Sequence, residues 1–183
     1  LVAVPRYRYN GRQHDIGERV AEIANKLNVA HLLLCGDGEA PGANVPGQRL
    51  DDLARGAPAQ PDYAALPFNH PLYVIYTSGT TGLPKCIVHS AGGTLINHRK
   101  EHMLHCDIGP GDRILYYTST AWMMYHWMIT ARASGATLVL YDGAALPKQD
   151  GTLDHDVLWR IAAETGTTHF GTSPKYLSLL EQD

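Results

Sequence analysis

The 183-residue sequence is poor in cysteine, in charge and in long apolar runs. It has three cysteines, an odd number without CxxC spacing, so a disulfide-built secreted domain is excluded and free thiols in a reducing, cytoplasmic compartment are expected. Charged residues make up only 18%, and the formal net charge is −3, so no basic excess attracts nucleic acid or an anionic membrane. No apolar run approaches the roughly 20 residues that cross a bilayer.

The sequence does have the size and apolar content of a packed domain. Hydrophobic residues make up 44% of the chain, and a chain of this length buries roughly 70% of its unfolded surface on folding. The chain begins at Leu1, shows no signal-peptide pattern and ends without a helix-stop signal. We therefore expect it to be an excerpt of a longer protein.

Apolar runs and stretches of helical spacing alternate along the sequence. The expected helices span residues 15–28, 50–55, 90–105 and 122–133, with another opening at Asp154 or Asp156 and a last one beginning at Pro174. The expected strands span residues 31–35, 72–76, 86–89, 114–118, 137–141 and 168–171, with 72–76 buried. Strands separated by such helices predict an α/β fold, a largely parallel sheet with helices on both faces.

One ten-residue stretch, Tyr76–Lys85, concentrates hydroxyl groups and glycines between two expected strands. Glycines let successive backbone N–H groups form an anion-holding concavity, and hydroxyls add donors that rotate to meet phosphate oxygens. Lys85 supplies a full positive charge. The pattern predicts a loop that holds a polyphosphate, and the alternative is a hairpin turn without a ligand. It is not a Walker A loop, because Lys85 lies three residues after Gly82 and leads into a strand.

The same stretch resembles the phosphate-binding signature of the adenylate-forming superfamily, which includes acyl-CoA synthetases, luciferases and the adenylation domains of nonribosomal peptide synthetases. Further stretches resemble the acetoacetyl-CoA synthetases within that superfamily. These are Tyr9–Gly11, His14–Asp15, His70–Leu72, Ile87–Ser90, Gly92–Gly93, Leu104–Asp107, Gly109–Arg113, Trp122–Met124, Leu140–Gly143 and Phe170–Ser173.

The resemblance implies a partial AMP-binding domain over residues 1–183, with a small C-terminal domain lying elsewhere in the parent chain. It implies a cytoplasmic ligase of lipid and ketone-body metabolism whose ligands are acetoacetate, ATP with Mg²⁺, and CoA. Acetoacetate would attack the α-phosphorus of ATP to give acetoacetyl-adenylate and pyrophosphate, and the CoA thiol would then displace AMP. We expect the 183 residues alone to be inactive.

The resemblance also implies roles for individual residues. Lys85 would be catalytic, and the β- and γ-phosphates would be held by Thr77, Ser78, Gly79, Thr80, Thr81, Gly82 and Lys85. The acyl pocket would be lined by Trp122, Met123, Met124 and His126, and CoA would be bound by Gly92, Gly93 and Arg12. No protein metal site is implied.

Two groups of residues have a plainer interpretation. The Trp122–Met128 stripe has the spacing of an ordinary helical core, so Trp122 is either a core residue or part of the pocket. His98, His102 and His105 share one helical face, which we expect to be solvated or inter-domain because Arg99 and Lys100 would oppose a bound cation.

Two other functions remain open from the sequence. One is a ligase of the same superfamily that acts on another short-chain acid. The other is a nucleotide-binding piece without catalytic chemistry.

Overall fold

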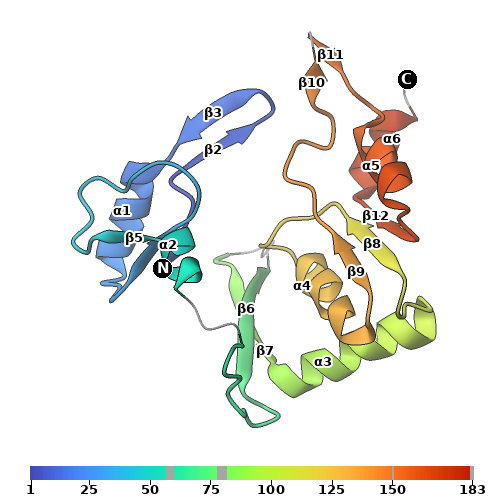
Figure 1. The fold of residues 1–183 in the computed structure, drawn as a ribbon, viewed down its shortest axis with the longest axis horizontal. Coiled ribbons are helices and arrows are strands. Elements are labelled where there is room, and N and C mark those ends of the chain that lie inside the picture. The colour runs from blue at the N-terminus through green and yellow to red at the C-terminus, as the bar shows by residue number, and fades with distance from the viewer. Residues whose placement is uncertain (57–59, 78–81, 150, 182–183) are drawn as a thin grey trace. The chain divides into compact units, whose positions relative to one another are not determined.

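The computed structural model describes residues 1–56, 60–77, 82–149 and 151–181 (Figure 1). The chain divides into two compact units, Leu1–Tyr63 and Ala64–Asp183. Each unit has strands and helices of its own, and each is described by itself.

The first unit is built on a small parallel sheet covered by one helix. The sheet has the order β1 (Val2–Ala3), β4 (Leu32–Leu34), β5 (Gly47–Arg49). Helix α1 (Gly17–Lys26) packs Val20 and Ala24 against Leu32 and Leu34 of β4. The helix expected at 15–28 and the strand expected at 31–35 are thus confirmed, with the helix beginning two residues later.

The first unit also contains a hairpin and a short helix. Strands β2 (Arg6–Tyr9) and β3 (Arg12–Asp15) pair antiparallel. Asn10 and Gly11 turn the chain between them at φ of 49° and 74°, the left-handed backbone that an Asn-Gly hairpin turn requires. The helix expected at 50–55 is confirmed as α2 (Leu50–Arg55).

The second unit follows the expected alternation of strands and helices. Its elements are β6 (Pro71–Thr77), β7 (Lys85–Ser90), α3 (Ala91–Lys100) with a π-helical turn (Glu101–His105), β8 (Arg113–Tyr116), α4 (Met123–Thr130) with a 3₁₀ turn (Ala131–Ser134), β9 (Thr137–Val139), β10 (Lys148–Gln149), β11 (Thr152–Leu153), α5 (Val157–Thr165), β12 (His169–Gly171) and α6 (Pro174–Leu180). All six strands and six helices expected from the sequence are present at their expected places.

A parallel sheet of order β12-β8-β9 forms the centre of this unit. Ile114 of β8 packs with Met128 and Ala131, which lie on α4 and the turn after it, and with Ile108 and Ala136. The expected α/β class with parallel strands is therefore confirmed. The short hairpins β2–β3, β6–β7 and β10–β11 are antiparallel, because a few residues suffice to connect each pair.

Strand β6 differs from its expected burial. Leu72, Val74 and Tyr76 are 53%, 48% and 64% exposed, so the expectation of a buried strand is wrong. Within the described residues β6 pairs with β7 alone, and the face that carries these three side chains is open. An apolar run in the sequence shows that its side chains favour burial, but the strand is buried only where another element packs over it.

Helices α3 and α6 begin where the sequence predicts, but only α6 has the side-chain capping bond that its sequence suggests. Ser90 stands at the N-cap of α3 but makes no side-chain capping bond; the N–H groups of Ala91 and Gly92 donate instead to the carbonyls of His70 and Phe68, at 2.8 and 2.9 Å. Pro174 opens α6 as expected, and the preceding Ser173 hydroxyl accepts a bond from the Tyr176 N–H.

Candidate functional site

The expected phosphate loop lies at the tip of the β6–β7 hairpin. Thr77 is the last residue of β6, Lys85 is the first residue of β7, and the two are direct cross-strand partners. The Cβ atoms of such partners lie about 5 Å apart, so Thr77 and Lys85 flank the mouth of the loop together. Four further residues predicted to bind phosphate, Ser78, Gly79, Thr80 and Thr81, lie outside the described residues.

The segment Gly82–Lys85, which leads from the loop into β7, is exposed to solvent. A Cβ built on Gly82 would meet no atom within 4 Å, and Leu83 is 92% exposed. Lys85 is exposed as well. The described segment that leads from the loop into β7 is therefore open to solvent.

The four residues predicted to line an acyl pocket lie at the start of α4. Trp122 is the N-cap residue and is 68% exposed, so its interpretation as a core residue is wrong. Met123 is 42% exposed, while Met124 and His126 are half-buried. Met128 is the fully buried residue of this helix, and Tyr125 and Trp127 pack against the same core cluster.

Gly92 and Gly93, predicted to bind CoA, lie in the first turn of α3. A Cβ on Gly92 would lie 2.2 to 2.6 Å from ring carbons of Phe68, and one on Gly93 would lie 2.7 Å from the Ser90 hydroxyl. The missing side chain of Gly92 thus admits the Phe68 ring. Whether CoA approaches the same backbone stays a prediction.

Arg12, the third predicted CoA contact, lies on β3 in the first unit. It is exposed and is the cross-strand partner of Tyr9. Its role in CoA binding also stays a prediction.

A stack of rings connects the hairpin to α4. The centroid of the Tyr73 ring on β6 lies 3.9 Å from that of the His126 ring, and the two ring planes form an angle of 18°. The centroid of the His89 ring on β7 lies 4.8 Å from that of Tyr73. Burial, together with the nearby His89, lowers the pKa of His126. Sequence reasoning missed Tyr73 and His89. Period-two alternation places Tyr73 and Ile75 on one face of β6, but it does not show which helix that face meets.

His98 and His102 are buried, so the expectation of a solvated or inter-domain face is wrong for these two residues. They are 4% and 0% exposed, because this side of α3 and its π-helical turn packs on α4. His98 Nδ1 lies 3.0 Å from the Thr130 hydroxyl, which donates to the His126 carbonyl, and His102 packs edge-on against Trp127. Burial lowers the pKa of both imidazoles. His105, the third member of the face, is exposed.

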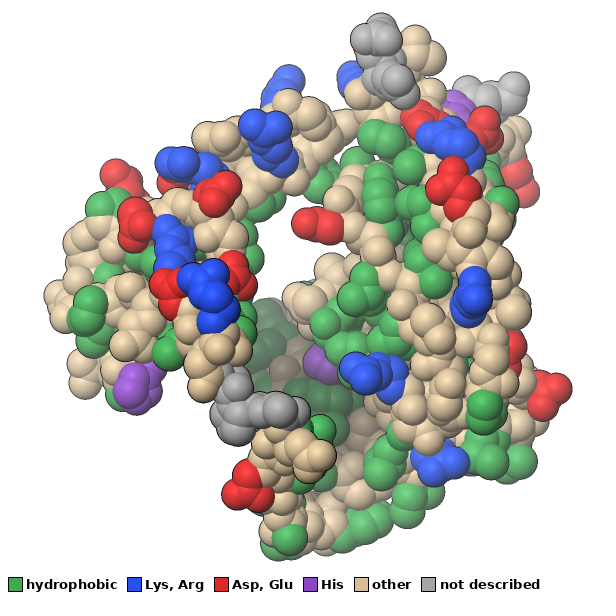
Figure 2. Space-filling model, viewed as in Figure 1, with side chains coloured by type: hydrophobic (Ala, Val, Ile, Leu, Met, Phe, Trp, Pro, Cys, Tyr) green, Lys and Arg blue, Asp and Glu red, His purple; other side chains and the backbone are tan. Residues whose placement is uncertain are grey.

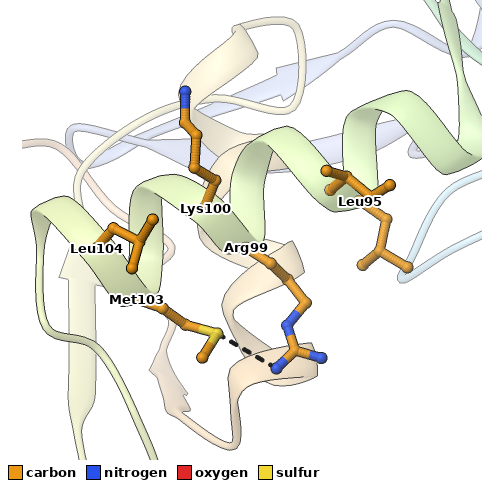
Figure 3. A pocket seen from close by; sticks show the side chains of 6 residues that line it. Leu95, Arg99, Lys100, Met103 and Leu104 are labelled. Atoms are coloured by element: carbon orange, nitrogen blue, oxygen red, sulfur yellow. Dashed lines mark hydrogen bonds between the residues drawn. The ribbon is translucent and has the colours of Figure 1, made fainter.

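The opposite side of α3 bears an open apolar groove (Figure 3). It is lined by Leu95, Ile96, Arg99, Lys100, Met103 and Leu104. Arg99 donates to the Met103 sulfur at 3.4 Å, as the dashed line shows. The groove contains none of the residues predicted to bind ATP, the acid or CoA.

The described part of the chain has neither a metal-binding cluster nor a membrane-spanning helix. There, no group of three or more His, Cys, Asp or Glu side chains is placed to hold a metal ion. Among the helices so described, none is long and apolar enough to span a membrane.

The fold defines a class: an α/β protein with parallel sheets, in which a stretch rich in Ser, Thr and Gly joins the two strands of a hairpin. The sequence model of the family described as AMP-binding enzyme matches residues 11–183. The chain belongs to the AMP-binding enzyme family.

The relatives of the chain include acetoacetyl-CoA synthetases and a malonamoyl-CoA synthetase. The chain is 53% identical to an acetoacetyl-CoA synthetase of Xenopus tropicalis, over 99% of this chain and 28% of the relative. It is 42% identical to a malonamoyl-CoA synthetase of Penicillium aethiopicum, over 95% of this chain and 26% of the relative. The solved acetoacetyl-CoA synthetase of Streptomyces lividans superposes with a TM-score of 0.86 at 42% identity, covering 99% of this chain and 27% of that one. The chain thus spans about a quarter of the length of these relatives.

Proposed function

We propose that residues 1–183 form part of the AMP-binding domain of an ATP-dependent acetoacetate–CoA ligase that acts in the cytoplasm. The proposal is supported by the acetoacetyl-CoA synthetases among its relatives. In the first step a carboxylate oxygen of acetoacetate attacks the α-phosphorus of ATP, and pyrophosphate leaves. In the second step the CoA thiol loses its proton, its sulfur attacks the acyl carbonyl carbon, and AMP leaves.

The chain's part in the first step is to hold the leaving pyrophosphate. Charge develops on that group as the bond to the α-phosphorus breaks, and preorganised donors stabilise it. The donors are the backbone and hydroxyl groups of Thr77, Ser78, Gly79, Thr80, Thr81 and Gly82, with the Lys85 ammonium. Mg²⁺ enters as part of the Mg-ATP substrate.

The other proposed contacts lie on the helices beside the hairpin and in the first unit. The acid site is lined by Trp122, Met123, Met124 and His126. Of these, Trp122 and Met123 are exposed at the start of α4 and so are accessible to the acid. Gly92, Gly93 and Arg12 contact CoA.

The single observation that carries the proposal is the cross-strand pairing of Thr77 with Lys85. In sequence the two residues are separated by a seven-residue loop; in the hairpin they stand side by side at its mouth. A lysine in this place adds a full positive charge beside a stretch rich in hydroxyl and backbone donors, which suits a triphosphate.

Acetoacetate-dependent exchange of pyrophosphate into ATP tests the proposal in the full-length protein. Removing one preorganised donor from such a site costs about 100-fold or more in turnover, so Lys85→Ala should lower exchange by at least that factor. Lys85→Arg should retain part of the activity because it keeps the charge. Unchanged exchange and unchanged ATP affinity by calorimetry in Lys85→Ala would refute the role of Lys85.

A second candidate function is ligation of another short-chain acid. The malonamoyl-CoA synthetase among the relatives favours it, because it is as similar as most of the acetoacetyl-CoA synthetases. A panel of acetoacetate, malonamate, acetate and propionate, compared by kcat/KM, distinguishes the two. A nucleotide-binding piece without chemistry would bind Mg-ATP and exchange no pyrophosphate with any of these acids.

A further inference from the structure

The β6–β7 hairpin has few buried contacts along its length. On β6, Leu72, Val74 and Tyr76 are exposed, and on β7 Ile87 and Val88 are 45% and 59% exposed. Tyr73, by contrast, is half-buried, and its ring contacts the imidazole rings of His89 and His126. Within the described part of the hairpin, the Tyr73 stack is therefore a prominent contact between the middle of these strands and the rest of the unit.

The foot of the hairpin is fixed separately. The Ala91 N–H donates to the His70 carbonyl at 2.8 Å, and the Gly92 N–H donates to the Phe68 carbonyl at 2.9 Å. These bonds hold the segment before β6 to the start of α3. They leave the far end, where Thr77 and Lys85 stand, to be positioned by contacts further along the strands.

The helix on the other side of the stack is firmly anchored. Met128 and Ala131 enter the core beside Ile114, at 2%, 0% and 1% exposure. His126 is further tied in through its carbonyl, which accepts a bond from Thr130 at 2.8 Å. Loss of the stack should thus release the hairpin and leave α4 in place.

We propose that Tyr73 is a positioning residue: stacked on His126, it holds the middle of the β6–β7 hairpin against α4 and so sets where Thr77 and Lys85, at the far end of the hairpin, lie. Thr77 lies four residues beyond Tyr73, about 13 Å along an extended strand. A small rotation at Tyr73 is therefore enlarged at the loop, and displacements near 1 Å are enough to impair catalysis. The inference rests on the proposed function, because it needs ATP in that loop.

Three variants of the full-length protein test the role of the ring. Tyr73→Phe keeps the stacked ring and loses the hydroxyl, and should show kcat and KM for ATP within about twofold of wild type. Tyr73→Leu keeps an apolar side chain and loses the stack. It should raise the KM for ATP and lower kcat/KM for pyrophosphate exchange by about 10-fold or more, with a smaller change in the KM for the acid. Val74→Ala, on the opposite face of the same strand, is the matched control and should behave as wild type.

A fourth variant covers the case in which Tyr73→Leu does not fold. His126→Ala removes the stack from the α4 side and should raise the KM for ATP as Tyr73→Leu does; the KM for the acid is not compared for this variant, because His126 is itself a proposed contact of the acid. Thermal melting of every variant separates a folding defect from a kinetic one: a purely structural role predicts a lower Tm with normal constants for the folded enzyme.

The outcomes distinguish the inference from the proposed function. The inference alone is overturned if the wild-type protein exchanges pyrophosphate normally and both Tyr73→Leu and His126→Ala keep the wild-type KM for ATP. Equal damage in Tyr73→Phe and Tyr73→Leu also overturns it, because the hydroxyl would then be the active group. A wild-type protein that neither binds nor exchanges ATP overturns the proposed function, and the inference falls with it.

Discussion

At the scale of single residues, the buried imidazoles of α3 have a consequence for stability. His98 is shifted to a lower pKa by burial and then by the nearby His102, His89 and His126, and Glu101 opposes the shift. His102 is shifted down by burial and by Arg99, with the Trp127 backbone and Glu101 opposing. Both side chains are therefore neutral in the folded state at pH 7, whereas in the unfolded chain they take up protons near pH 6.5.

The sign of the resulting pH dependence follows from that difference. Above about pH 6.5 both states are neutral and nothing is lost. As the pH falls below that value, the unfolded chain binds protons that the folded protein excludes, so the free energy of unfolding decreases until the folded-state pKa values are reached. Urea denaturation at pH 7.5 and 5.5 should show this decrease.

Two substitutions make the pH experiment specific. His102→Leu removes a buried titrating group and should flatten the dependence, whatever it does to stability at pH 7.5. Met103→Leu, at an exposed position of the same turn, changes no titrating group and should leave the slope unchanged. Equal slopes in wild type and His102→Leu would show that His102 is not excluded from protonation in the folded state.

Residue chemistry predicted some of the candidate site and not the rest. The hydroxyls, glycines and lysine of the loop are informative because their chemistry is local. The burial of His98 and the exposure of Trp122 are not local, since both depend on which side of a helix meets a neighbour. The Tyr73 stack could not be predicted from the sequence for the same reason, because the two rings that contact Tyr73 lie on other elements, β7 and α4.

At the scale of elements, Gly92 explains how α3 meets the segment before β6. Gly92→Ala would place a methyl group 2.2 Å from a ring carbon of Phe68. The overlap should destabilise the fold by about 1–3 kcal/mol, which exceeds the roughly 1 kcal/mol that alanine gains over glycine in a helix. Thermal and urea unfolding measure the difference.

A matched glycine and a double variant control this prediction. Gly109→Ala adds a methyl where no atom lies within 4 Å, and should change stability by no more than about 0.5 kcal/mol. Phe68→Ala combined with Gly92→Ala should lose less than the sum of the two single changes, because the clash is gone. Strict additivity would mean that Phe68 does not occupy this space.

Helices and strands were the most predictable level of the structure. Helical spacing, apolar runs and the proline at position 174 located the main elements to within a few residues. The β2–β3 hairpin was missed although Asn10–Gly11 is a strong turn signal, because Arg6–Tyr9 has no apolar run beside it. The openness of β6 could not be predicted, since the sequence of a strand does not state what covers it.

At the scale of the whole molecule, apolar side chains remain at the surface of the second unit. On α3 and its π-helical turn, Leu95, Ile96, Met103 and Leu104 are between 45% and 75% exposed, and Figure 2 shows further apolar side chains at the surface. Contiguous patches of this kind mark surfaces that contact another chain or segment. They agree with a chain that spans about a quarter of its relatives' length.

This openness leads to a prediction about activity. Holding the leaving pyrophosphate is one part of adenylation; the acid and the α-phosphorus must also be aligned and water excluded, and these requirements together supply most of the rate. Under the proposed function, residues 1–183 supply the groups that hold the phosphates and some of the contacts to the acid. We therefore expect this piece to show no acetoacetate-dependent pyrophosphate exchange above background, while the full-length protein exchanges readily. Both proteins should be assayed at equal molarity, with Lys85→Ala as the inactive reference in each. Robust exchange by the 183-residue piece would mean that every group needed for adenylation already lies within it.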